Sequence, residues 1–148
     1  MDVKKVKEQL VAAGIEVYRT RPAEIHVAER VRLHIMDSGV RVQLGEELRV
    51  SFTARSQRSD FPDEASETEL FARIRSTIGP GAVERGYVET WSGTTPVTDP
   101  VDAEKILDVY HEVTWTKPAD GADSAIAEVQ WALGLERYVP PASVPPGS

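Results

Sequence analysis

A chain of 148 residues without cysteine is long enough to bury one hydrophobic core, and it can contain neither a disulfide nor a thiol nucleophile. Its formal net charge of −7 argues against general nucleic-acid binding, which depends on neutralising phosphates. The N-terminal residues show no apolar signal-peptide core, and no apolar run is long enough to span a bilayer, so we expect a cytoplasmic protein without a membrane partner.

The charge is distributed unevenly along the chain. Residues 1–58 carry 11 Lys and Arg against 8 Asp and Glu, whereas residues 59–148 carry 6 against 16. Opposite charges attract across interfaces. The basic part is therefore expected to meet an acidic surface on the same chain, on a second copy or on another protein.

The N-terminal segment has the pattern of a helix followed by an edge strand. Asp2 is suited to cap a helix over residues 3–13, whose apolar side chains recur at helical spacing, and Gly14 is suited to end it. Residues 15–20 predict a short strand that Pro22 ends. The alternative, a helix from Pro22 to Ala28, is less favoured because the alternation of the following strand continues without a break into Val31.

Residues 24–55 predict a three-stranded antiparallel meander. Apolar and polar residues alternate from Ile25 to Ile35, Asp37-Ser38-Gly39 has turn chemistry, and the alternation resumes over residues 40–44 and 48–54. One face of the meander is apolar and requires helices to cover it.

The opposite face of the meander is rich in arginine, and it is the main candidate for a binding surface. The partner-binding residues expected there are Arg30, Arg32, Arg41, Arg49 and Arg55, beside His34, Gln43, Ser51 and Thr53. The alternative is an ordinary solvated face whose arginines pair with nearby carboxylates.

The second half of the chain predicts one helix, two strands and a further helix. Ser66 and Glu69 match a capping box for a helix that Gly79-Pro80-Gly81 should stop. Strands are expected over residues 86–91 and 107–117, separated by a loop over 92–100 and a helical turn over 101–106. A last helix is expected from Asp120 or Asp123 to Gly134. Residues 138–148 read as a proline-rich flexible tail that follows a single domain over residues 1–137.

These elements predict an α+β fold, in the order α-β-β-β-β-α-β-β-α, with an antiparallel sheet of about five to six strands and helices packed on one face. This order resembles that of the type III secretion chaperones and their YbjN-like relatives. The resemblance implies a small, acidic, dimeric protein that binds other proteins.

Histidines and tryptophans provide the remaining candidate sites. His111 belongs to the inward face of its strand, which predicts either a hydrogen-bonded core imidazole or, as the alternative, a ligand pocket. His26 and His34 are too far apart along one strand to share a metal, and the acidic run over residues 60–69 does not match a calcium loop. We expect no metal and no cofactor. Trp131 lies off the apolar stripe of its helix and is the candidate for an exposed interface anchor.

No combination of residues matches a catalytic motif. We therefore expect a non-enzymatic protein-interaction module, an adaptor, chaperone-like protein or assembly subunit, that binds an acidic protein partner or forms a homodimer through the arginine-rich face. The alternative is a small-ligand-binding or enzymatic domain with a pocket near His111.

Overall fold

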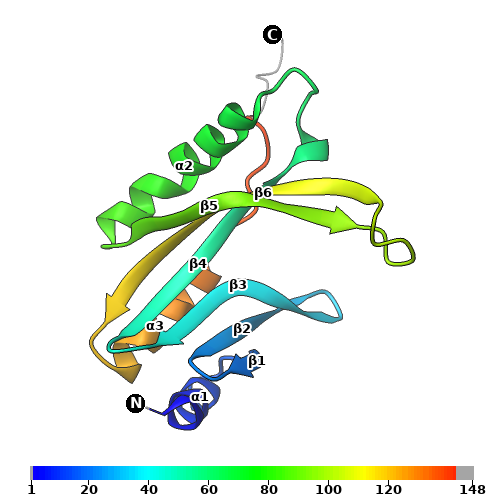
Figure 1. The fold of residues 1–148 in the computed structure, drawn as a ribbon. Helices are drawn as coiled ribbons and strands as arrows, with labels where there is room; N and C mark the ends of the chain where they lie inside the picture. Colours follow the sequence, from blue (N-terminus) through cyan, green and yellow to red (C-terminus); the bar gives the residue numbers. More distant parts are fainter. Residues whose placement is uncertain (1, 143–148) are drawn as a thin grey trace. The chain divides into compact units, whose positions relative to one another are not determined.

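The computed structural model describes residues 2–142, and it confirms the α+β class and the order of the elements. Six antiparallel strands form one sheet in the order β1-β2-β3-β4-β6-β5 (Figure 1). The elements are α1 (Val3–Ala12), β1 (Val17–Arg21), β2 (Glu24–Val31), β3 (His34–Leu44), β4 (Leu48–Gln57), the short helix η1 (Arg58–Asp60), α2 (Glu67–Glu84), β5 (Val88–Thr98), β6 (Ile106–Ala119) and α3 (Ala122–Leu133).

The contacts within the chain divide it into two compact units. Unit 1 contains the residues up to Thr53 together with Trp115–Leu135, and unit 2 contains Ala54–Thr114 and the residues from Glu136 onward. Strands β4 and β6 therefore each contribute residues to both units. The expectation of a single domain over residues 1–137 stays a prediction.

The core of unit 1 lies between its strands and the helices α1 and α3. Asp2 caps α1 by accepting the backbone N–H of Lys4, as the sequence predicts. Across the strands, Ile25 pairs with Val42 and Val42 with Val50, and all three side chains are completely buried. The apolar face of the predicted meander therefore exists. Helix α1 contacts α3, β1 and β2, while α3 contacts β3.

Strands β2 and β3 meet at a different place from the expected turn. The hairpin turns at Arg32-Leu33, where Val31 pairs with His34, and Asp37-Ser38-Gly39 lies inside β3. The prediction of a turn at residues 37–39 was wrong. Those residues form a bulge instead, since the pairing shifts between His26 and Ala28 and Gly39 has a φ of 77°.

Helix α2 of unit 2 begins as predicted and ends later than predicted. The hydroxyl of Ser66 accepts the backbone N–H of Glu69, which confirms the cap. The helix then continues through Pro80 to Glu84, so the expected stop at residues 79–81 was wrong. Ala82 in this last part is completely buried, so the helix packs against the core beyond Pro80, where one helical hydrogen bond is lost.

The end of unit 2 also differs from the sequence-based expectation. Strand β5 is longer than predicted, and a turn takes the place of the helical turn expected at residues 101–106. Tyr138, assigned to the flexible tail, forms a parallel bridge with Arg55 of β4, and the next residue, Val139, is 1% exposed. Residues 138 and 139 therefore belong to the folded part of unit 2, whereas residues 143–148 of the predicted tail lie outside the described part of the chain.

Candidate interaction surface

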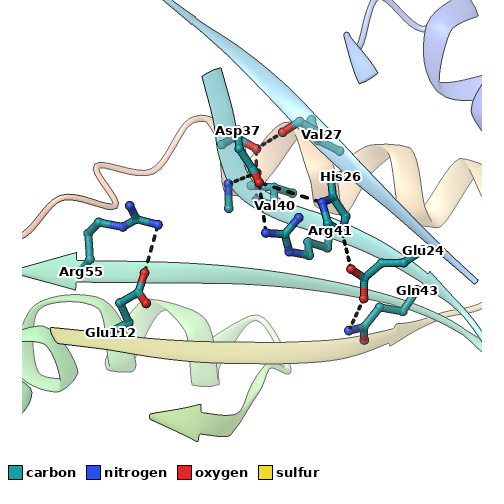
Figure 2. A network of polar contacts seen from close by, with 11 residues as sticks. Glu24, His26, Val27, Asp37, Val40, Arg41, Gln43, Arg55 and Glu112 are labelled. Carbon is teal, nitrogen blue, oxygen red and sulfur yellow. Dashed lines mark hydrogen bonds and ion pairs between the residues drawn. The ribbon is translucent and has the colours of Figure 1, made fainter. Parts of the chain in front are cut away.

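The polar face of the sheet in unit 1 contains a partly buried cluster of side chains rather than a free row of arginines. The pairing of β2 with β3 places Glu24 opposite Gln43 and His26 opposite Arg41. Asp37 of β3 completes this polar cluster, which Figure 2 shows from close by. His26 bonds to Glu24 through Nε2, and Gln43 approaches the same carboxylate at 3.5 Å.

Arg41 is held inside the polar cluster by Asp37. Its Nη2 lies 3.1 Å from Oδ2 of Asp37, and Oδ1 of the same carboxylate accepts the backbone N–H of Gly39 at 3.0 Å (Figure 2). Burial raises the pKa of Asp37, but the Gly39 N–H and the positive charge of Arg41 lower it more, so the pKa lies below its ordinary value. Arg41 is therefore a structural ion-pair partner and is poorly placed to receive a second protein.

Three other predicted binding arginines are also paired with carboxylates. Arg30 lies 2.6 Å from Glu16 of unit 1, and Arg49 lies 3.0 Å from Glu47. In unit 2, Arg55 lies 3.0 Å from the nearly buried carboxylate of Glu112 (Figure 2) and covers the ring of Tyr110. These four arginines are therefore neutralised by neighbouring carboxylates, which was the alternative to a free binding surface.

Arg32 differs from the other arginines. It occupies the first position of the β2–β3 turn, and its backbone has a φ of 58°, which residues other than glycine rarely adopt. Arg32 makes no ion pair with any residue between 2 and 142. The predicted surface therefore separates into a paired polar face and one unpaired arginine at the turn.

The residues around Arg32 are exposed and mostly apolar. We call residues 31–36 the hairpin tip; all six are exposed, and the tip lies at the end of the hairpin away from α1 and α3 (Figure 1). Leu33 at the turn is 96% exposed, and the other apolar side chains of the tip are Val31, Ile35 and Met36, each about half exposed. Leu33 and Ile35 were expected in the core, and that expectation was wrong, because the hairpin extends beyond the helices that would cover it.

The two remaining predicted site residues are packed inside their units. Trp131 is only partly exposed, and its ring packs edge-on against the buried ring of Phe52, with the ring centroids 5.8 Å apart. Trp131 is therefore not the exposed anchor that the sequence predicted. His111 is 5% exposed, meets Phe71 of α2 edge-on, and has its Nε2 3.4 Å from a carboxylate oxygen of Glu67. Its Nδ1 is buried without a hydrogen-bond partner in the described part of the chain.

Two further kinds of site can be judged from the described residues. Among residues 2–142, no three side chains of the metal-binding types come together. No helix in this range is long and apolar enough to cross a membrane.

Sequence reasoning missed both the hairpin tip and the polar cluster. Both depend on the register of β2 against β3, because the register decides which residues stand opposite each other and which pass beyond the helices. The one available signal for the tip was the absence of carboxylates from Arg30 to Met36, a segment with two arginines and one histidine.

Comparison with known proteins adds no assignment: no family model matches the chain, and neither a curated protein nor a solved structure matches it.

Proposed function

We propose that this protein is a non-enzymatic interaction module whose contact with a protein partner is made by the hairpin tip. The supporting observation is the group of six consecutive exposed residues at the tip, four of them large and apolar. Single exposed apolar residues are common on protein surfaces, whereas several of them at one end of a hairpin are typical of an interaction site. The proposed binding site is therefore at the end of the β2–β3 hairpin, whereas the sequence predicted it across the arginine-rich face.

The charge of the tip indicates which partners suit it. Arg32 and His34 belong to the tip, Arg30 adjoins it, and the segment they span lacks carboxylates. Unlike Arg41 and Arg49, Arg32 is not neutralised by a carboxylate within residues 2–142. A partner with an apolar patch bordered by carboxylates would complement both properties of the tip.

The backbone of the tip adds a second reason to assign it a role. A residue other than glycine with positive φ costs about 1–2 kcal/mol. Arg32 adopts this conformation in a solvent-exposed turn where glycine would be more stable. An arginine at such a position is best explained by selection for its side chain.

A pocket for a small ligand has less support. His111, the residue proposed for it, is packed against Phe71, with little solvent access. A hollow of about 750 Å³ lies at the other end of the β2–β3–β4 strands, but its lining includes Glu24, Glu46, Glu47 and Arg49. Sites for small molecules are mostly apolar and enclosed, so this polar hollow does not resemble one.

The experiment that tests the proposal compares variants of the tip. The wild-type protein, Leu33→Asp and Arg32→Glu are used as bait, and each candidate partner is then purified and its Kd measured directly. Arg21→Glu is the matched control, because Arg21 is also exposed in unit 1 but lies at the end of β1. We expect Leu33→Asp to weaken binding at least tenfold, since it places a charge in an apolar contact.

The proposal fails if a purified partner binds the wild type and the tip variants equally well. It also fails if the protein binds vesicles that contain anionic lipid and Leu33→Asp abolishes that binding, because a basic and apolar tip would then serve a membrane surface.

A further inference from the structure

A second hairpin end in the molecule is complementary to the hairpin tip. We call residues 99–107, which connect β5 to β6 and include the first two residues of β6, the acidic end. It contains three carboxylates, on Asp99, Asp102 and Glu104, and a single lysine. Its large apolar side chains are also exposed: Val101 by 96%, Ile106 by 60% and Leu107 by 53%.

The acidic end is held in one conformation by its own hydrogen bonds. One carboxylate oxygen of Asp99 accepts the backbone N–H groups of Val101 and Asp102, at 2.8 and 3.2 Å. The carboxylate of Asp102 accepts the N–H of Glu104 at 3.1 Å, and the backbone of Lys105 bonds to both Asp99 and Asp102. An ordered loop loses little conformational entropy on binding, so this end is suited to form an interface.

Glu104 is the carboxylate of the acidic end that takes no part in holding the loop. The two aspartates use side-chain oxygens to hold the loop, whereas the Glu104 side chain has no ion-pair partner among residues 2–142. Arg32 of the hairpin tip is likewise unpaired in the described part of the chain. Each hairpin end therefore presents exposed apolar side chains and a charged side chain without an ion-pair partner, Arg32 on the tip and Glu104 on the acidic end, and these two charges are opposite.

We propose that the hairpin tip of one copy binds the acidic end of a second copy, with Arg32 facing Glu104 and Leu33 packing against Val101. This inference rests on the proposed function, because it names the partner of the same tip. Such an end-on contact is small, and small interfaces are weak. In a two-fold dimer each copy contributes its tip and its acidic end, so that the contact is made twice.

A charge exchange between two variants tests this pairing. Arg32→Glu and Glu104→Arg each place like charges in the contact, so each variant alone should be monomeric. When the two variants are mixed, the carboxylate introduced at position 32 of one copy meets the guanidinium introduced at position 104 of the other, and the second contact is the wild-type pair. We therefore expect the mixture to dimerise although neither component does.

The measurement is mass in solution by sedimentation velocity, against a monomer mass of 16.3 kDa. We expect the wild type to sediment as a dimer at about 100 µM, and each single variant to have a dissociation constant at least tenfold higher. The control Arg21→Glu changes the net charge by the same amount as Arg32→Glu and should dimerise like the wild type. Unchanged circular dichroism and melting temperature establish that the variants are folded.

Three results would overturn the pairing. They are a monomeric wild type at this concentration, a mixture that stays monomeric, and an Arg21→Glu control that dissociates as readily as Arg32→Glu. A monomeric wild type whose tip binds a different purified protein would reject this inference and leave the proposed function standing. Loss of every tip-dependent interaction would reject both.

Discussion

The hydroxyl of Ser38 donates a buried hydrogen bond of 2.6 Å to the carbonyl oxygen of Val27 on the neighbouring strand. The hydroxyl oxygen of Ser38 also accepts the backbone N–H of Val40 at 3.0 Å. Val27 stands opposite the bulge of β3, where one residue of β2 faces the three residues Ser38, Gly39 and Val40. The hydroxyl thus replaces ladder hydrogen bonds that the bulge interrupts, and the bulge in turn sets the register of the strand that leads to the hairpin tip.

Replacing Ser38 with alanine should destabilise unit 1 by about 2 kcal/mol, because a buried carbonyl and a buried N–H would each lose a partner. Urea denaturation measures this change in the free energy of unfolding. The control is Ser76→Ala on α2, whose exposed hydroxyl bonds to the carbonyl of Arg73 and whose loss should cost less than about 0.5 kcal/mol. Equal effects of the two substitutions would contradict the role given to Ser38.

Replacing Arg32 with glycine should stabilise the fold and weaken self-association. Glycine adopts positive φ without steric cost, so the substitution removes the strain at the turn. The greater conformational entropy of the unfolded glycine variant offsets part of this gain, and the free energy of unfolding should rise by about 0.5–1 kcal/mol. Arg21→Gly, in β1, lacks this relief and should be destabilising. Thermal denaturation and sedimentation of the same samples measure both properties. A variant that loses stability as well as association would show that the arginine is structural.

Interactions between residues that are close in the sequence could be predicted from it. Asp2 and Ser66 cap their helices as expected, because each bonds to a backbone N–H two or three residues further on. The alternation of apolar and polar residues likewise predicted the buried face that contains Ile25, Val42 and Val50. At Pro80 local preference was overruled, since the helix continues to Glu84 although propensity alone assigns a cost of about 3 kcal/mol to a proline in a helix interior.

The candidate site could not be predicted because it depends on register. Asp-Ser-Gly is as well suited to a bulge as to a turn, and arginine gives no sign of a turn with positive φ. A turn five residues earlier moves Leu33 from the core to the end of the hairpin. The carboxylates that neutralise Arg30 and Arg55 are distant in sequence, at Glu16 and Glu112, so no local pattern indicated them.

Stability should fall in acid as two aspartates become protonated, one in each unit. Hydrogen bonds to Ser59, Gln57 and Val109 lower the pKa of Asp108 to about 2, and the pKa of Asp37 also lies below its ordinary value of 3.8. A lowered folded-state pKa means that the ionised form stabilises the fold above the unfolded-state pKa. This contribution is lost as the pH falls from about 4 through the folded-state value.

Substituting each aspartate should therefore reduce the acid sensitivity of its own unit. Asp37→Asn should cost on the order of 1 kcal/mol at pH 7, through the lost ion pair with Arg41, and less at pH 2. Asp108→Asn should act in the same pH range on unit 2. Urea unfolding at pH 7, 4 and 2 gives the comparison. A cost that does not change with pH would show that the charge of Asp37 contributes nothing.

Val139 should contribute to the stability of unit 2 although it lies in the segment assigned to a flexible tail. Its side chain is 1% exposed, its N–H bonds to the carbonyl of Arg55 at 2.8 Å, and its carbonyl accepts the hydroxyl of Ser56 at 2.7 Å. Val139→Ala should cost about 2 kcal/mol through the lost apolar burial. Val83→Ala is the matched control, because Val83 on α2 is 65% exposed and should change stability by less than about 0.5 kcal/mol. Hydrogen exchange of the Val139 amide provides the independent measurement: if it exchanges as fast as an unstructured peptide, the segment does not pair with β4.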